Sequence, residues 1–233
     1  MIEFPGGEDR GETMGLLDDL KRQADMVRTH DSLQRSNLQD NVRVVDEAMH
    51  RAFLYLLELF KQLGILRPAN PTVYAITGVG ELRDMTYVDG FVDPRKKKFA
   101  EREVYDYMEF YVKWSAPKAL TVTRDMPQTI AKVREMLWAT NIKFTEVETK
   151  SAYNSVLKVD FTIPVAVTVN FTVRADHEGR RLLFFGKNAL RLGVDDFAVP
   201  ADELSEAVLE ELAKVLIGQK SNFHRYRAVL PRT

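Results

Sequence analysis

The chain has 233 residues, 45% of them hydrophobic, so it can bury a core without metal or disulfide crosslinks. Its 33 basic and 34 acidic residues leave a net charge of -1, which excludes a whole-molecule field that attracts nucleic acid or anionic membranes. Cysteine is absent, which excludes disulfides, thiolate metal sites and cysteine nucleophiles. We interpret this absence as favouring a reducing, cytoplasmic location. No apolar run approaches the roughly 20 residues that span a bilayer, so we expect no membrane partner.

Residues 1–13 are acidic and contain several glycines, and they lack the apolar stretch of a signal peptide. We expect an acidic disordered leader here. Because Met14 opens the first periodic segment, we also consider Met14 as an alternative start.

Residues 14–66 carry two amphipathic helical patterns. The first begins at Gly15 and has a thin apolar stripe; the second opens with the Ser36 and Gln39 capping box. We predict an antiparallel helical hairpin, with one longer bent helix as the alternative. The stripe from Leu38 to Leu63 is expected mainly to cover a sheet, and it also offers a surface for homodimerisation.

Residues 72–218 show mainly strand patterns after the breakers Pro68 and Pro71. A hairpin is predicted after Pro71, followed by a charged loop over residues 93–98 and a strand over residues 101–114. A short strand precedes a helix opened by Asp125 and Pro127, and another strand follows that helix.

The clearest period in the chain lies between Val156 and Asp176, where odd positions are apolar and most even positions are polar. The phase survives Pro164, so this is either one bent strand or two strands joined at a corner. The next predicted strand contains Gly186, which indicates a bulge or a close backbone approach. A C-terminal helix is predicted from Pro200.

This order of elements predicts an α+β fold. We expect a mainly antiparallel sheet of about six to eight strands with helices packed on one face, preceded by the N-terminal helical hairpin. Residues 219–233 form a basic tail without acidic side chains. That tail is a candidate to dock on a protein partner, on nucleic acid or on the acidic leader.

Three short motifs favour structure over chemistry. Glu47 and His50 lie one helical turn apart, but opposite the apolar stripe, so we interpret them as a solvated face. The glycines at 78 and 80 favour a hairpin turn, because the third glycine of a phosphate loop is missing. Asp106 lies on the same side of its predicted strand as the apolar residues. We expect its carboxylate to pair with a neighbouring group in a structural role and not to act as a general acid or base. We predict no metal site and no cofactor.

The opposite side of the strand predicted over residues 101–114 carries the candidate binding site. Tyr105, Tyr107 and Tyr111 alternate there with Lys113, and the cations Lys96, Lys97 and Lys98 lie just upstream. Such a face can stack flat ligands or bases. Tyrosines also favour strands for packing reasons, and nearby glutamates oppose phosphate binding, so nucleic acid is not the favoured partner.

These features predict a non-enzymatic binding or interaction module, with homodimerisation as an option. The alternative is a binder of a ligand or single-stranded nucleic acid that uses the tyrosine-bearing face and basic segments. A cofactor-free enzyme comes third.

Overall fold

The structure is a computed structural model that describes residues 16–231 and divides into two units, up to Asp40 and from Asn41. Its helices are α1 (Leu16–Leu66), α2 (Pro127–Ala139) and α3 (Glu206–Leu216), followed by the 3-10 turn η1 (Phe223–Tyr226). The strands are β1 (Ala69–Asn70), β2 (Tyr74–Ile76), β3 (Gly80–Leu82), β4 (Met85–Phe99), β5 (Arg102–Ser115), β6 (Leu120–Arg124), β7 (Thr145–Lys150), β8 (Val156–Ile163), β9 (Ala166–Asp176), β10 (Arg181–Lys187) and β11 (Val194–Pro200).

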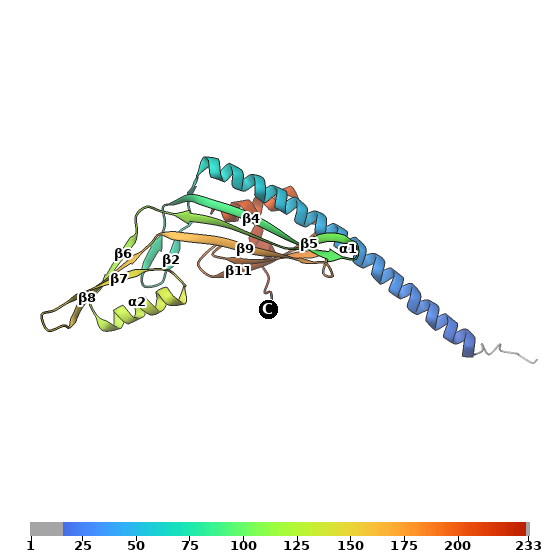
Figure 1. The fold of residues 1–233 in the computed structure, drawn as a ribbon, viewed down its shortest axis with the longest axis horizontal. Helices are drawn as coiled ribbons and strands as arrows, with labels where there is room; N and C mark the ends of the chain where they lie inside the picture. The colour runs from blue at the N-terminus through green and yellow to red at the C-terminus, as the bar shows by residue number, and fades with distance from the viewer. Residues whose placement is uncertain (1–15, 232–233) are drawn as a thin grey trace, which may run out of the picture. The chain divides into compact units, whose positions relative to one another are not determined.

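An antiparallel six-stranded sheet, in the order β1-β4-β5-β9-β10-β11, organises the second unit. From Asn41 onward α1 lies against this sheet, and α3 packs into the same core (Figure 1). The α+β class and the helices on one face are therefore confirmed. The leader predicted for residues 1–13 lies outside the described residues.

Helix α1 is one continuous helix, so the longer helix left open by the sequence is the observed alternative and the helical hairpin is wrong. The polar residues between the two predicted helices do not break it. In the second unit the predicted stripe is buried, with Val45, Met49, Ala52 and Leu56 fully inaccessible. Because the sheet of the same chain covers these residues, the stripe is not accessible for homodimerisation, and the prediction of a dimer through it is wrong.

The periodic segment consists of two strands that belong to different sheets. Strand β8 lies between β6 and β7 in a three-stranded sheet, whereas β9 lies in the centre of the six-stranded sheet. Pro164 stands at the corner between them, where the chain needs no ladder hydrogen bond from that residue. The odd positions stay buried on both sides of the corner, from Val159 to Val173.

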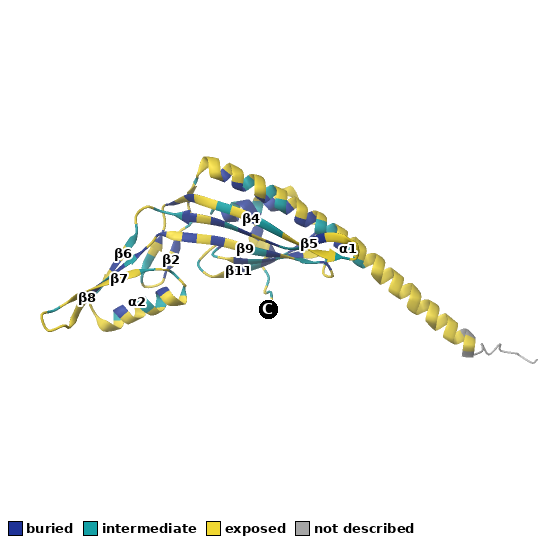
Figure 2. Ribbon diagram, in the orientation of Figure 1, coloured by how far each residue is buried: buried dark blue, intermediate teal, exposed yellow. Residues whose placement is uncertain are grey.

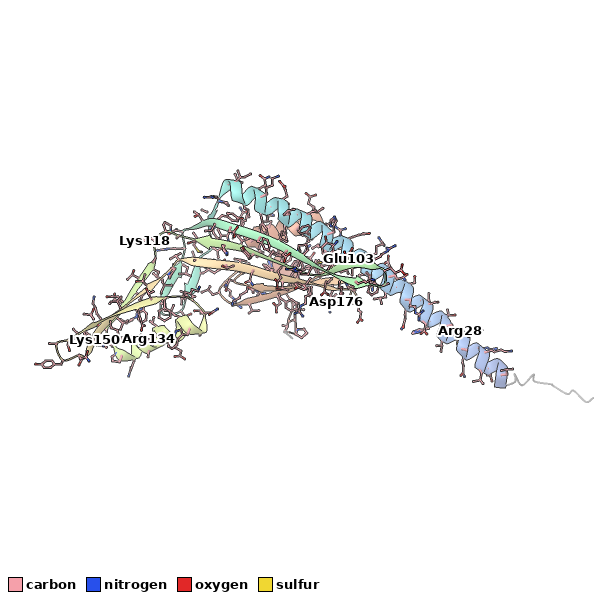
Figure 3. All side chains as sticks on the ribbon, in the orientation of Figure 1. Arg28, Glu103, Lys118, Arg134, Lys150 and Asp176 are labelled. Carbon is pink, nitrogen blue, oxygen red and sulfur yellow. The ribbon has the colours of Figure 1, made fainter. Side chains whose placement is uncertain are left out.

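Helix α2 packs on the three-stranded sheet. Ile130, Val133 and Leu137 form its buried stripe, as the sequence predicts. Arg134 reaches the edge strand β7 with both guanidinium branches, 2.8 Å from the Glu146 carboxylate oxygens (Figure 3). This pair is largely exposed, so it fixes the register of α2 more than it stabilises the fold.

Two regions differ from the predicted elements. Residues 93–98 are part of strand β4 and do not form a loop. Residues 194–200 form strand β11, so the C-terminal helix begins at Glu206 and not at Pro200. Asp195 is buried at an inward position of β11, where it pairs with Arg227, and this charge hides the strand period.

The C-terminal segment is part of the folded body. Phe223 is fully buried against Phe184 and Phe197, and Tyr226 is 9% exposed. Arg227 forms a bridge with Phe197 and donates to the buried Asp195 carboxylate. This part of the basic tail thus covers the free edge of β11, which corrects the expectation that its aromatic residues are free to dock on a partner.

Candidate functional site

The six-stranded sheet has one covered face and one face that no helix covers in the described chain. Buried and exposed residues alternate along β9 (Figure 2). We call the outward-pointing set the open face. It comprises Asp89, Phe91, Asp93, Arg95, Tyr107, Glu109, Tyr111, Lys113, Thr168, Asn170, Thr172, Arg174, Asp176, Arg181, Leu183, Phe185, Lys187, Asp196 and Ala198.

An aromatic pair lies on the open face. Phe91 and Tyr111 are cross-strand partners on β4 and β5, with ring centroids 5.9 Å apart. The Tyr111 hydroxyl donates to the Asp89 carboxylate at 3.1 Å, and the Lys113 ammonium lies 4.7 Å from the Tyr111 ring centroid. Phe91 nevertheless remains 51% exposed. The pair is therefore held in place by neighbours on two strands while keeping apolar area in contact with solvent.

A second aromatic side chain extends the open face toward the opposite edge. Phe185 on β10 is half-buried, and the Arg174 guanidinium lies 5.3 Å from its ring centroid. Strand pairing places Thr172 directly between Glu109 and Phe185. Aromatic side chains therefore lie on β4, β5 and β10, with the polar outward residues of β9 between them, and the rigid strands fix their positions before any partner arrives.

The charges of the open face nearly cancel. Its five cations are balanced by five carboxylates, and some of these form local pairs. Arg95 lies 2.6 Å from Asp93, and Lys113 lies 3.8 Å from Asp89. A phosphate backbone needs a surplus of cations, so this face does not favour nucleic acid. Protein surfaces with aromatic residues at the centre and mixed charges around them are typical of protein interfaces.

Of the predicted site residues, Tyr107, Tyr111 and Lys113 share the open face, whereas Tyr105 does not. The pairing of β4 with β5 shifts by one residue between Arg95 and Lys96, leaving Asp106 as an extra residue. This bulge turns Tyr105 inward, where it is 4% exposed. The prediction of a face with three tyrosines is therefore wrong.

Helix α1 holds the inward position of Tyr105. The Tyr105 backbone N–H donates to the Asp46 carboxylate at 2.7 Å, and the Tyr105 hydroxyl lies 3.0 Å from His50 Nδ1. Burial and the nearby Asp46 carboxylate raise the pKa of the Tyr105 hydroxyl. A neutral, packed phenol of this kind supports the fold and is not available to stack a ligand.

The three predicted lysines lie along an edge strand. Beyond its short pairing with β1, the outer edge of β4 has no partner strand in the described chain. Lys96 lies 4.8 Å from the Tyr105 ring centroid, Lys97 lies 2.7 Å from Asp106, and Lys98 is exposed. Lysines, Pro94 and two register shifts are the devices that keep sheet edges from pairing with other chains. We therefore interpret the basic run as edge protection.

The remaining candidate residues serve structure. Asp106 is partly exposed and pairs with Lys97 at 2.7 Å, which is a structural pairing of the kind we expect. Glu47 is exposed and pairs with Arg43 at 3.0 Å, as expected for a solvated face. Within residues 16–231, no group of three or more potential ligands is placed to hold a metal ion, and no helix is apolar and long enough to cross a membrane.

His177 is one of three buried polar side chains, with Asn70 and Asp195, that sequence reasoning missed. It lies in the turn after β9, near the end of the sheet where Figure 3 labels Glu103 and Asp176, and it is 8% exposed. Neither ring nitrogen has a hydrogen-bond partner in the described chain, and the ring lies 6.5 Å from that of Phe99. Burial, aided by the Lys97 charge, lowers the pKa of His177 against the opposing effects of the Tyr105 backbone, Asp46 and Asp106.

Comparison with protein families, with curated proteins and with solved structures finds no match to this chain. Any functional conclusion must therefore be argued from the geometry of the chain itself.

Proposed function

We propose that this protein is a non-enzymatic interaction module, that its binding surface is the open face, and that the occupant is a second copy of the chain. The observation that carries this proposal is the half-exposed Phe91 beside Tyr111 on an uncovered sheet face. Exposed aromatic side chains on rigid strands lose little conformational entropy on binding, which makes them effective anchors. The absence of cysteine favours a cytoplasmic setting for this module.

The charge pattern supports a second copy as the occupant. In a two-fold symmetric interface the same patch faces itself, so the patch must carry both charge signs to be complementary. The open face meets this condition, with Glu109 on β5 and Arg174 on β9 flanking its centre. Two sheet faces pack about 10 Å apart, a spacing that aromatic side chains fill well.

Sedimentation velocity over a range of protein concentrations tests the proposal. We expect the wild-type chain to form a dimer, and the double variant Phe91→Ser/Tyr111→Ser to remain a monomer. The matched control is Leu54→Ser/Leu57→Ser on α1, because these leucines are also about half exposed, at 50% and 51%. The control should dimerise like the wild type.

Two results would contradict the proposal. One is a wild-type chain that stays monomeric at every concentration. The other is a dimer that the α1 variant dissociates and the open-face variant leaves intact, which would assign the interface to the outer surface of α1. Fluorescence anisotropy with a labelled single-stranded oligonucleotide tests the alternative function, and we expect no saturable binding because the face has no surplus of cations over carboxylates.

A further inference from the structure

A cleft lies at one end of the open face, where the loop after α2 meets the start of β9 and the end of β10. Its volume is about 320 Å³, at the lower end of the range for small-molecule sites. The walls include Lys143 from the α2–β7 loop, Thr168 and Asn170 from β9, and Lys187 from β10. Three segments far apart in the sequence therefore contribute side chains to one concave surface.

The cleft lining carries a net positive charge, whereas the charges of the open face as a whole nearly cancel. Two lysines line it, and none of its twelve lining residues is acidic. Within residues 16–231, neither Lys143 nor Lys187 forms an ion pair, whereas Lys97 and Lys113 of the same sheet each have a carboxylate partner. Two unneutralised ammonium groups in a concave site concentrate positive potential there.

Polar side chains that can donate hydrogen bonds complete the lining. The Thr168 hydroxyl and the Asn170 amide form no hydrogen bond to other groups of the described chain, so their hydrogen-bonding capacity is open to a ligand. Asn170 is the cross-strand partner of Lys187, which places an amide directly beside an ammonium. This combination of donors suits a phosphate or carboxylate group.

The wall beyond β10 is fixed by internal hydrogen bonds. The Asn188 side-chain amide donates to the Thr168 carbonyl at 3.1 Å, and its side-chain oxygen accepts from the Gly193 N–H at 3.1 Å. The Tyr74 hydroxyl donates to the Asn188 carbonyl at 3.1 Å. These bonds hold the loop against β9, so the cleft exists before a ligand arrives.

The C-terminus of α2 also borders the cleft, and its free carbonyl groups would oppose an anion. They are already occupied. The N–H groups of Thr140, Asn141 and Ile142 donate to the carbonyls of Met136, Trp138 and Leu137 at 2.9 to 3.1 Å. This capping removes most of the local repulsion, and two full positive charges exceed the roughly half charge of a helix end.

We infer that this cleft is a binding site for the phosphate or carboxylate group of a small molecule. Lys143 and Lys187 supply the charge, and Asn170 and Thr168 supply neutral hydrogen bonds that orient the group. Asn170 and Lys187 lie at one end of the open face, in the same cross-strand row as Tyr111, whereas Lys143 comes from the α2–β7 loop outside that face.

Titration of the isotope-labelled full chain with inorganic phosphate and, separately, with citrate tests this inference by NMR. We expect saturable shifts in the amides of residues 140–143, 166–170 and 187–192. The double variant Lys143→Gln/Lys187→Gln should weaken binding at least tenfold. The matched control Lys98→Gln/Lys118→Gln removes the same charge outside the cleft and should change affinity less than twofold.

The two probes distinguish the anion. Tighter binding of phosphate assigns a phosphoryl group to the site, and tighter binding of citrate assigns a carboxylate. Equal weakening by the cleft and control variants would overturn the inference, because binding would then follow net charge alone. Absence of saturable shifts with both probes would also overturn it. The Phe91→Ser variant changes a residue on β4, two strands away from β9, and should keep wild-type affinity for the probe, which separates this site from self-association.

Discussion

The two faces of the six-stranded sheet come from the same strands but have different roles. In β5 the inward residues Met108, Phe110, Val112 and Trp114 are all at most 2% exposed, while the outward Glu109 and Lys113 are exposed. Helices α1 and α3 of the same chain cover the inward face, whereas Phe91 on the outward face remains exposed to solvent. Apolar residues on the first face are therefore part of the core, and those on the second remain accessible to solvent, as the proposed interface requires.

The largest expected effect lies on the covered face. Phe171 is 1% exposed and stacks on Phe110, with ring centroids 5.2 Å apart. Phe171→Ala should lower the free energy of unfolding by about 3–5 kcal/mol, because it leaves a cavity in a packed cluster. Phe91→Ala on the open face should lower it by less than about 1 kcal/mol. Urea denaturation measures both, and equal losses would contradict the division between the faces.

The next effect concerns the close approach predicted at Gly186. A Cβ atom there would lie 2.5 Å from the Asp195 carbonyl oxygen and 2.6 Å from the Phe171 ring. Gly186→Ala should therefore destabilise the chain by about 1–3 kcal/mol through overpacking. Gly64 in α1 has open space around its Cβ position, so Gly64→Ala should instead stabilise by up to about 1 kcal/mol. Thermal unfolding with both variants checks the pair, and a neutral Gly186→Ala would count against the close packing of the covered face.

A smaller effect should depend on pH through His177. Because burial lowers the folded-state pKa of His177, the unfolded chain takes up the proton first as the pH falls below about 6.5. This contribution to stability is complete above that pH and is lost as the pH falls toward the folded-state pKa. The Asp176 pKa is also lowered, but that carboxyl group acts in the more acidic range.

Denaturation measured between pH 8 and pH 5 tests this expectation. The wild type should lose stability over this range, and His177→Phe, which retains an aromatic ring beside Phe99, should lose less. Parallel pH profiles for the two proteins would show that His177 does not titrate on unfolding.

The smallest effect on stability is expected at the β4 edge. Lys96→Val/Lys98→Val should change the free energy of unfolding by no more than about 0.5 kcal/mol, yet it should increase aggregation, because it removes charges that keep the edge unpaired. Light scattering during storage at high concentration measures this change. Unaltered solubility would contradict the edge-protection role and reopen these lysines as binding residues.

Regular alternation made much of the sheet predictable from the sequence. The inward and outward residues of β9 follow directly from a two-residue period. The position of Tyr105 does not, because its bulge is held by Asp46, a residue 59 positions away. Local patterns carry no information about such a contact, so the predicted tyrosine face contained one residue too many.

Charges misled the sequence analysis in two other places. Pro94 and the following lysines are typical of a loop, but an edge strand accepts them because one of its sides needs no partner. In β11 the buried Asp195 interrupts the apolar period, and its partner Arg227 is contributed by the C-terminal segment. The cleft was unpredictable for a similar reason, since Lys143 and Lys187 are brought together only by the fold.

The most direct test of the open face as a self-association surface is a distance measurement between two copies. Because the chain has no cysteine, Glu109→Cys allows one spin label per chain near the centre of this face. We expect double electron–electron resonance to give a short distance between the spin labels of the two copies. This distance is set by the spacing of about 10 Å between packed sheets plus the length of the two label linkers. A label at Lys61→Cys on α1 should report a longer distance. A short distance from the α1 label, or no intermolecular distance from Glu109→Cys, would contradict the account.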